Sequence, residues 1–189
     1  MMHSYETTRL NLEPLVEAHA TELFEPLCDP KLYEFIPTNP PESMSWLADR
    51  YERLSLRTSP DGNEQWLNWV IRVKDSRVPV GTVEVTIRQD ETALLAYTVF
   101  ASEWGMGYAR EACGCVVREL FQNGHVKEFI AHVDTRNVRS IRLLESLKFS
   151  LVDTIVGADK FKGSVSDEFV FSFRNTKAEV QEVILSPHQ

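Results

Sequence analysis

The stretch "EWGMGYAREA", residues 103–112, decides how the sequence is interpreted. It places Gly105 and Gly107 one residue apart, directly after the apolar run "YTVF" and before residues that favour helix. Glycine weakens regular secondary structure by about 0.5–1 kcal/mol relative to alanine. Two glycines so close together therefore indicate that the backbone itself has a structural or binding role here. We expect a strand to end near Phe100 and a helix to begin near Tyr108.

The expected helix has a clear buried face. Ala109, Cys113, Val116 and Leu120 follow one another at helical spacing, and "NG" at 123–124 is a good stop. The first four N–H groups of a helix have no partner inside it, and such an end binds anions, phosphate above all. Glycines just before that end let a phosphate approach the backbone closely. The stretch is therefore either a phosphate cradle made of main chain or a plain tight turn.

Two common phosphate motifs do not match. A dinucleotide fingerprint needs a third glycine, and Arg110 stands at that position. A P-loop needs G-x-x-x-x-G-K-[ST], which this sequence does not contain.

Length and composition are those of one globular domain. The 189 residues are 43% hydrophobic and 25% charged, with no apolar run long enough for a membrane helix and no signal-peptide core at the start. Three cysteines form no disulfide framework, so we expect a cytoplasmic protein whose Cys113 and Cys115 are core thiols. The net charge of −8 disfavours nucleic acid as a partner. It is compatible with a cationic substrate or simply with solubility.

Outward from the glycines, apolar periodicity predicts the other elements. Strands are expected over 7–15, 66–75, 79–90, 93–100, 128–134, 151–159 and 168–174. Helices are expected over 16–29 and 42–57, from Tyr108, and from about Asn137. This order predicts an α+β fold with a mixed, mostly antiparallel twisted sheet of about seven strands and helices on both faces. We expect a single domain over 1–189, with its core at about 7–173 and a C-terminal tail at 175–189.

Four segments together resemble a known family. "WGMGYAREA" after "AYTVF", and "NVRSIRLLESLKF" some thirty residues later, are similar to the signature segments of the GNAT superfamily of acyl-CoA-dependent N-acetyltransferases. The first matches the pattern [RQ]-x-x-G-x-[GA], with Trp104 at the usual Arg or Gln position. A tryptophan there is typical of the RimJ/RimL-like branch, the ribosomal-protein N-terminal acetyltransferases. "TTRLNLEPL" and "WVIRVKDSRVPVGTVEV" resemble the opening strand and middle hairpin of that branch, so the resemblance covers about 7–173.

The resemblance implies a site for acetyl-CoA and no metal. The pyrophosphate of acetyl-CoA would lie on the main-chain N–H groups of the segment Trp104, Gly105, Met106, Gly107, Tyr108 and Ala109. The strand near Val99 and Phe100 would pair with the pantetheine arm, and a splay between this strand and "EFIAHVD" would admit the thioester. Asn137 would hold the pantetheine, or would serve only as a helix N-cap.

The resemblance also implies attack of a neutral primary amine on the thioester. Many members use a tyrosine acid where Leu144 stands, whereas this branch often uses a serine at the position of Ser140. Ser140 lies on an apolar stripe that faces inward, although a serine in a helix often bonds only to a carbonyl of its own helix. The usual strand glutamate is replaced by Leu94. Glu84, on the neighbouring strand, is the alternative base or merely a solvated strand residue.

The expected activity is transfer of the acetyl group of acetyl-CoA to a primary amine by direct attack in a ternary complex. The acceptor would be a protein N-terminal α-amino group or a small-molecule amine, and the protein a monomer or a homodimer without membrane or nucleic-acid partners. The alternative is a weak or inactive acyl-CoA-binding module of the same fold, suggested by Leu94 and Leu144. His132 is expected near the thioester, where a surface or structural role is the competing interpretation.

Overall fold

The computed structural model describes residues 2–174 of the chain, so the expected tail at 175–189 lies outside the described part. Within it, eight strands form one sheet: β1 Tyr5–Glu6, β2 Leu10–Pro14, β3 Glu64–Val73, β4 Pro79–Arg88, β5 Thr92–Val99, β6 Glu128–Asp134, β7 Ser150–Phe161 and β8 Ser164–Arg174. Four α-helices accompany it: α1 Ala20–Leu27, α2 Met44–Ser55, α3 Tyr108–Gln122 and α4 Val138–Ser146. Short 3-10 turns cover η1 Glu17–His19, η2 Pro30–Tyr33 and η3 Ala101–Glu103. The predicted α+β class with a mostly antiparallel sheet is confirmed.

The sheet has the order β1-β2-β3-β4-β5-β6-β8-β7 and is antiparallel except between β5 and β6. That parallel pair is connected by α3, as parallel neighbours require a crossover. It is also very short, because β5 and β6 pair only from Thr92 to Leu94, while β5 continues to Val99. The two strands therefore diverge, and the predicted splay is confirmed.

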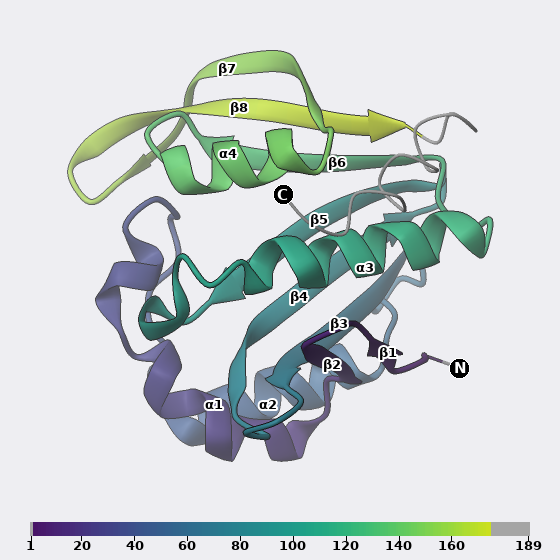
Figure 1. Ribbon diagram of the computed structural model, residues 1–189. Helices are drawn as coiled ribbons and strands as arrows, with labels where there is room; N and C mark the ends of the chain where they lie inside the picture. The colour runs from purple at the N-terminus through teal and green to yellow at the C-terminus, as the bar shows by residue number, and fades with distance from the viewer. Residues whose placement is uncertain (1, 175–189) are drawn as a thin grey trace.

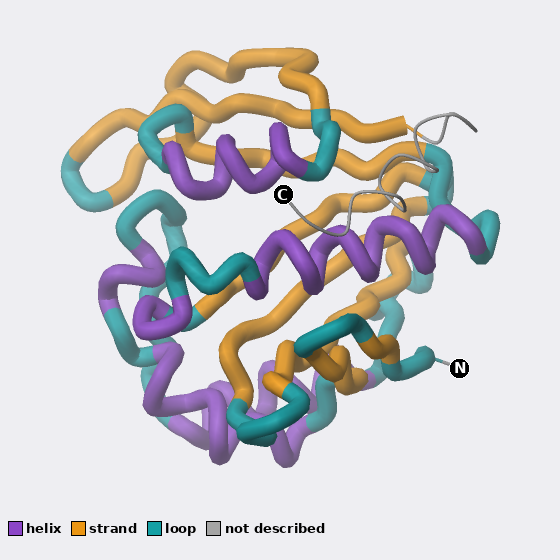
Figure 2. Tube along the Cα trace, in the orientation of Figure 1, coloured by secondary structure: helices purple, strands orange, loops and turns teal. Residues whose placement is uncertain are grey.

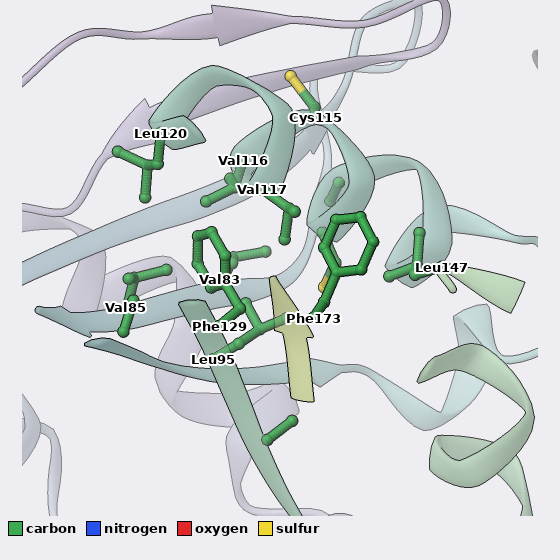
Figure 3. Packing of buried hydrophobic residues seen from close by; sticks show 14 of the residues in the cluster. Val83, Val85, Leu95, Cys115, Val116, Val117, Leu120, Phe129, Leu147 and Phe173 are labelled. Carbon is green, nitrogen blue, oxygen red and sulfur yellow. The ribbon is translucent and has the colours of Figure 1, made fainter. Parts of the chain in front are cut away.

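Helices cover both faces of the sheet (Figures 1 and 2). On one face, α3 and α4 bury an apolar cluster whose packing Figure 3 shows, with Val116 and Leu120 of α3 above Val83, Leu95 and Phe129 of the strands. On the other face, α1 and α2 pack on a smaller cluster. Its members are Leu15, Ala20, Leu23, Leu47, Tyr51, Val70 and Phe100.

Element boundaries follow the sequence closely in α3 and β6, whereas β8 begins at Ser164, four residues before the expected start at 168. Helix α3 begins at Tyr108 and ends before the "NG" stop, as predicted. The sheet has one strand more than the approximate count, because Tyr5–Glu6 pairs with β2. The predicted helix over 16–29 begins as the turn η1 and becomes α-helical only at Ala20. Cys113 and Cys115 are buried free thiols, as expected. No helix in residues 2–174 has the length and apolar character needed to cross a membrane.

Candidate active site

The loop between β5 and α3 presents unpaired main-chain N–H groups. Gly105 and Gly107 have φ values of 81° and 78°, in the left-handed region that favours glycine. Gly107 is the N-cap of α3 and offers no side chain to cap it. The amides of Gly105, Gly107, Tyr108 and Ala109 find no acceptor among residues 2–174. This end of α3 therefore suits an anion, and the helix dipole adds partial positive charge there.

The loop is braced by its own Trp104 side chain and by side chains from two other segments. The indole Nε1 of Trp104 donates to the carbonyl oxygen of Val99 at 2.8 Å, which ties the loop to the end of β5. The guanidinium of Arg139, on α4, stacks over the Trp104 ring at 3.8 Å. Arg9, from the turn before β2, donates to the carbonyl oxygen of Met106 at 2.9 Å.

A cavity of about 580 Å³ extends from this loop along the splay. Its walls are the free part of β5, residues 131–134 of β6, the first turns of α3 and α4, η2 and the β7–β8 hairpin. It brings together most of the residues that the sequence singled out: Val99, Trp104, Gly105, Gly107, Tyr108, Ala109, Asn137 and Ser140.

Three predicted residues stand apart from the cavity wall. Phe100 is buried in the cluster under α1 and α2. Met106 is 52% exposed, and its main-chain carbonyl accepts a hydrogen bond from Arg9. Glu84 lies near Arg50, with 3.9 Å between carboxylate and guanidinium. Burial raises the pKa of Glu84, and the Arg50 charge offsets part of that rise.

The first turn of α4 holds both a cap and an available hydroxyl. The Oδ1 atom of Asn137 accepts from the Ser140 amide at 3.2 Å, so the N-cap role exists, and Asn137 also lines the cavity. Among the described residues, the Ser140 hydroxyl makes no bond to a carbonyl of its helix. The Ser146 hydroxyl, in contrast, donates to the Leu143 carbonyl at 2.7 Å. Ser140 is therefore free to act on a ligand.

Tyr97, which the sequence did not single out, stands beside Ser140. Its hydroxyl is buried and has no well-oriented hydrogen-bond partner within residues 2–174, yet the Ser140 side chain is close enough to act on its pKa. Burial is the larger effect and raises the pKa of Tyr97, so the phenol stays protonated. In the sequence, a strand tyrosine with alternating apolar neighbours is typical of a core residue. The alternation therefore gave no sign of this polar contact.

Ionisable side chains of opposite sign lie on different elements around the cavity. Arg110 and Arg139 come from the first turns of α3 and α4, and Arg142 from the second turn of α4. His132 and Glu168 come from β6 and β8, where Nδ1 and Oε2 are 2.9 Å apart. An anion is therefore favoured at the helix ends, and a cation near the strands. No group of three or more His, Cys, Asp or Glu side chains within residues 2–174 is arranged to hold a metal ion.

The comparisons with known proteins agree with this geometry. A family profile described as "Acetyltransferase (GNAT) domain" matches residues 9–150, which is most of the chain. The chain belongs to the GNAT acetyltransferases. An "Uncharacterized N-acetyltransferase p20" of Bacillus licheniformis is 23% identical over 171 residues, covering 90% of this chain and 96% of that protein.

Solved GNAT structures share the fold over nearly the whole chain. A RimL ribosomal L7/L12 alpha-N-protein acetyltransferase in complex with coenzyme A superposes with a TM-score of 0.82 at 16% identity, covering 91% of this chain and 98% of that one. A ribosomal-protein-S5-alanine acetyltransferase from Vibrio fischeri gives 0.79 at 17% identity, covering 92% and 97%. The GNAT neighbours thus include the RimJ/RimL-like enzymes that the sequence indicated.

Proposed function

We propose that this GNAT enzyme transfers the acetyl group of acetyl-CoA to a primary α-amino group while both substrates are bound. One observation carries the proposal: unpaired amides at the N-terminus of α3 open into a cavity that continues along the unpaired edge of β5. The amides suit the pyrophosphate, and the edge suits the amide groups of the pantetheine arm.

The reaction needs little beyond positioning. Holding amine and thioester in contact supplies much of the rate, since well-oriented reactants reach effective molarities of about 10⁵–10⁸ M. The Ser140 hydroxyl, which lines the cavity, would donate a proton to the departing sulfur. An unpaired N–H on the free edge of β5 would stabilise the oxyanion.

An α-amino group is favoured over a lysine side chain. Its pKa of about 7.7–8.0 leaves a useful neutral fraction at pH 7, whereas a lysine amine at about 10.4 is almost fully protonated. RimL, which has the same fold, is described as acting on an α-amino group of a ribosomal protein. We place the reaction in the cytoplasm, where free thiols such as Cys113 stay reduced.

Calorimetric titration with acetyl-CoA tests the cradle. Gly105→Trp should abolish binding, because the indole would occupy space that the anion needs. Gly124→Trp is the matched control: Gly124, just beyond the other end of α3, has φ of 72°, and a Cβ there, as at Gly105, meets nothing within 4 Å. Both variants carry the same backbone strain, but only the first alters the cradle. NADH, a dinucleotide, should not bind.

Thiol release distinguishes turnover from binding alone. Peptides with a free N-terminal serine or alanine should release coenzyme A, and the same peptides with acetylated N-termini should not. Acetyl-CoA binding without thiol release from any of them would favour the inactive binding module. Acetyl-CoA binding that Gly105→Trp leaves intact would contradict the cradle.

A further inference from the structure

We propose that His132 is the general base that takes the proton from the acceptor amine, and that Glu168 is the positioning residue that fixes its tautomer. The inference rests on the proposed acetyl transfer. It supplies the base that neither Leu94, which has no ionisable group, nor Glu84, which is set apart from the cavity, provides.

The first step is the hydrogen bond between the two side chains. Nδ1 of His132 lies 2.9 Å from Oε2 of Glu168, across the neighbouring antiparallel strands β6 and β8. An ionised carboxylate can only accept, so Nδ1 must carry the hydrogen. In the neutral ring, Nε2 then has a free lone pair. The carboxylate also stabilises the imidazolium that forms when Nε2 takes a proton.

The second step is the side of the sheet on which the ring lies. Phe129, Ala131 and Val133 alternate along β6 and are buried in the core cluster under α3. Since successive strand residues point to opposite faces, His132 points to the other face. Its side chain is 41% exposed and lines the cavity. The cradle at α3 holds the cofactor on one face, so an amine that approaches from the opposite face reaches the splay beside His132.

The third step is the set of charged groups around the ring. From β5, the residues on the same face are Leu94, Ala96 and Thr98, which carry no charge. One strand further, β4 brings Glu84 to this face opposite Ala96, with the Arg50 guanidinium 3.9 Å from its carboxylate. Besides Glu168, the surrounding elements bring Asp134 on β6 itself, Asp159 on β7 and Lys31 on η2 to the cavity wall.

Asp134 is not available as the base. Its carboxylate is held by Arg136 at 2.6 Å and by the Ser166 hydroxyl at 2.5 Å. The remaining carboxylates on this wall, Asp159 and Glu168, stand against Lys31 and against Lys162, whose Nζ lies 3.4 Å from the Ile36 carbonyl oxygen. Glu168, bonded directly to the ring, attracts the ammonium form of an amine to the place where Nε2 can deprotonate it.

The proton balance closes without another reactant. The acceptor ammonium gives one proton to Nε2 of His132 and becomes a neutral amine. Its nitrogen lone pair attacks the thioester carbonyl carbon, and collapse of the tetrahedral intermediate breaks the C–S bond. The sulfur leaves with the bonding pair and takes a proton, while the new amide nitrogen loses one. His132 returns its proton to solvent, so each turnover yields acetylated amine, coenzyme A and one proton.

The first measurement is the tautomer of His132, which requires no substrate. Nitrogen-15 NMR of the whole protein at high pH should show the hydrogen of this ring on Nδ1. Glu168→Gln should shift the ring toward the Nε2–H form, which is the commoner one without a partner. A wild-type ring with its hydrogen on Nε2 would overturn the inference directly.

The second measurement is the pH profile of thiol release with a peptide that has a free N-terminal serine. His132→Gln should lower kcat/KM by about 10²-fold or more, and its acid limb should move to the ionisation of the peptide amine. Glu168→Gln should lower it by about tenfold. His125→Gln, a change in an exposed histidine of the α3–β6 connection, should leave the profile unchanged.

The outcomes separate the inference from the function on which it rests. No binding of acetyl-CoA by the wild type would overturn both. Acetyl-CoA binding with no thiol release from free-amine peptides would overturn the base and favour the binding module. Wild-type turnover with an acid limb that His132→Gln does not alter would overturn the inference alone.

Discussion

Arg9 and Glu111 form an ion pair that joins the turn before β2 to the first turn of α3, with 2.6 Å between Nε and Oε2. The same carboxylate accepts from the Arg9 amide at 2.8 Å and from the Thr7 hydroxyl at 2.6 Å. Burial works to raise the pKa of Glu111, but these hydrogen bonds outweigh it and hold the pKa below its usual value. Arg9 also holds the Met106 carbonyl, so the pair fixes the cradle from outside.

Removing this brace should weaken cofactor binding. In Arg9→Met, the aliphatic stem remains but the bonds to Glu111 and Met106 are lost, so the cradle becomes more mobile. We expect acetyl-CoA affinity to fall about fivefold, the equivalent of about 1 kcal/mol for one half-exposed contact, measured by calorimetry. Lys74→Met is the control, because it breaks the Lys74–Glu6 pair but leaves the Lys74 amide bonded to the Arg9 carbonyl and leaves the Arg9 side chain intact. Equal affinity in both variants would show that the cradle keeps its shape unaided.

The Tyr97 hydroxyl should act on Ser140 and contribute nothing to stability. A buried hydroxyl without a good partner costs about 1–3 kcal/mol, so Tyr97→Phe should leave the free energy of unfolding equal or higher. The kcat should nevertheless fall, by about fivefold or more, with KM for acetyl-CoA unchanged, because the two neighbouring hydroxyls bond once a bound substrate brings them into line. Urea unfolding and thiol release measure the two effects. A clear loss of stability would mean instead that the hydroxyl is well bonded in the folded protein.

Asp134 should make the protein sensitive to acid. The Arg136 guanidinium, chiefly, and the Ser166 hydroxyl lower the pKa of Asp134 to about 2 against the cost of burial. Because the folded pKa lies below the unfolded value of about 3.9, the stabilisation is complete above that value and is lost as pH falls toward 2. It amounts to at most about 2.6 kcal/mol, since one pKa unit corresponds to about 1.4 kcal/mol.

Unfolding of Asp134→Asn in urea across this range checks the sign. The variant should be less stable than the wild type at pH 7, and the difference should shrink as pH falls toward 2. Asp75→Asn, in the exposed β3–β4 turn, is the control. A difference that grows toward low pH would contradict the assignment of the shift to the Arg136 pair.

The fold was predictable where local patterns and tertiary packing agree. The alternation of "EFIAHVD" and the helical stripe from Ala109 to Leu120 gave β6 and α3 with their observed bounds. The predicted α-helix over 16–29 was wrong at residues 16–19. This segment forms a 3-10 turn, in which the His19 ring accepts a hydrogen bond from the Val16 amide. Such local bonds of polar side chains leave little periodic signal.

The main-chain part of the candidate site was the easier part to predict. Gly105 and Gly107, just before a helix, indicated a segment whose backbone is open to a ligand, and both have the positive φ that favours glycine. Tyr97 and the pair of His132 with Glu168 were not predictable as contacts, since strands separated by 36 residues must first meet in the sheet. Alternation places each side chain on a face, but only the register between strands shows which side chains meet.

The same dependence on register makes Gly81 critical for the site. Gly81 of β4 pairs with Val99 of β5, where the strand reaches the cradle. A Cβ on Gly81 would lie 2.9 Å from the Val99 Cα and would collide with the Thr98 carbonyl oxygen, both of which are backbone. Backbone cannot give way as a flexible side chain can, so β4 and β5 would have to separate.

Gly81→Ala should therefore destabilise the protein by about 3 kcal/mol or more, at the upper end for overpacked interiors. Where folded protein remains, its affinity for acetyl-CoA should fall as well, because the end of β5 carries the Val99 carbonyl that holds Trp104. Gly62→Ala is the control: its φ of 73° is strained for alanine, but no atom lies within 4 Å of the new Cβ. Gly62→Ala should lower the free energy of unfolding by only about 1 kcal/mol, and the affinity for acetyl-CoA should be unchanged. Equal unfolding free energies for the two variants, measured in urea, would show that β4 and β5 can separate there without disturbing the cradle.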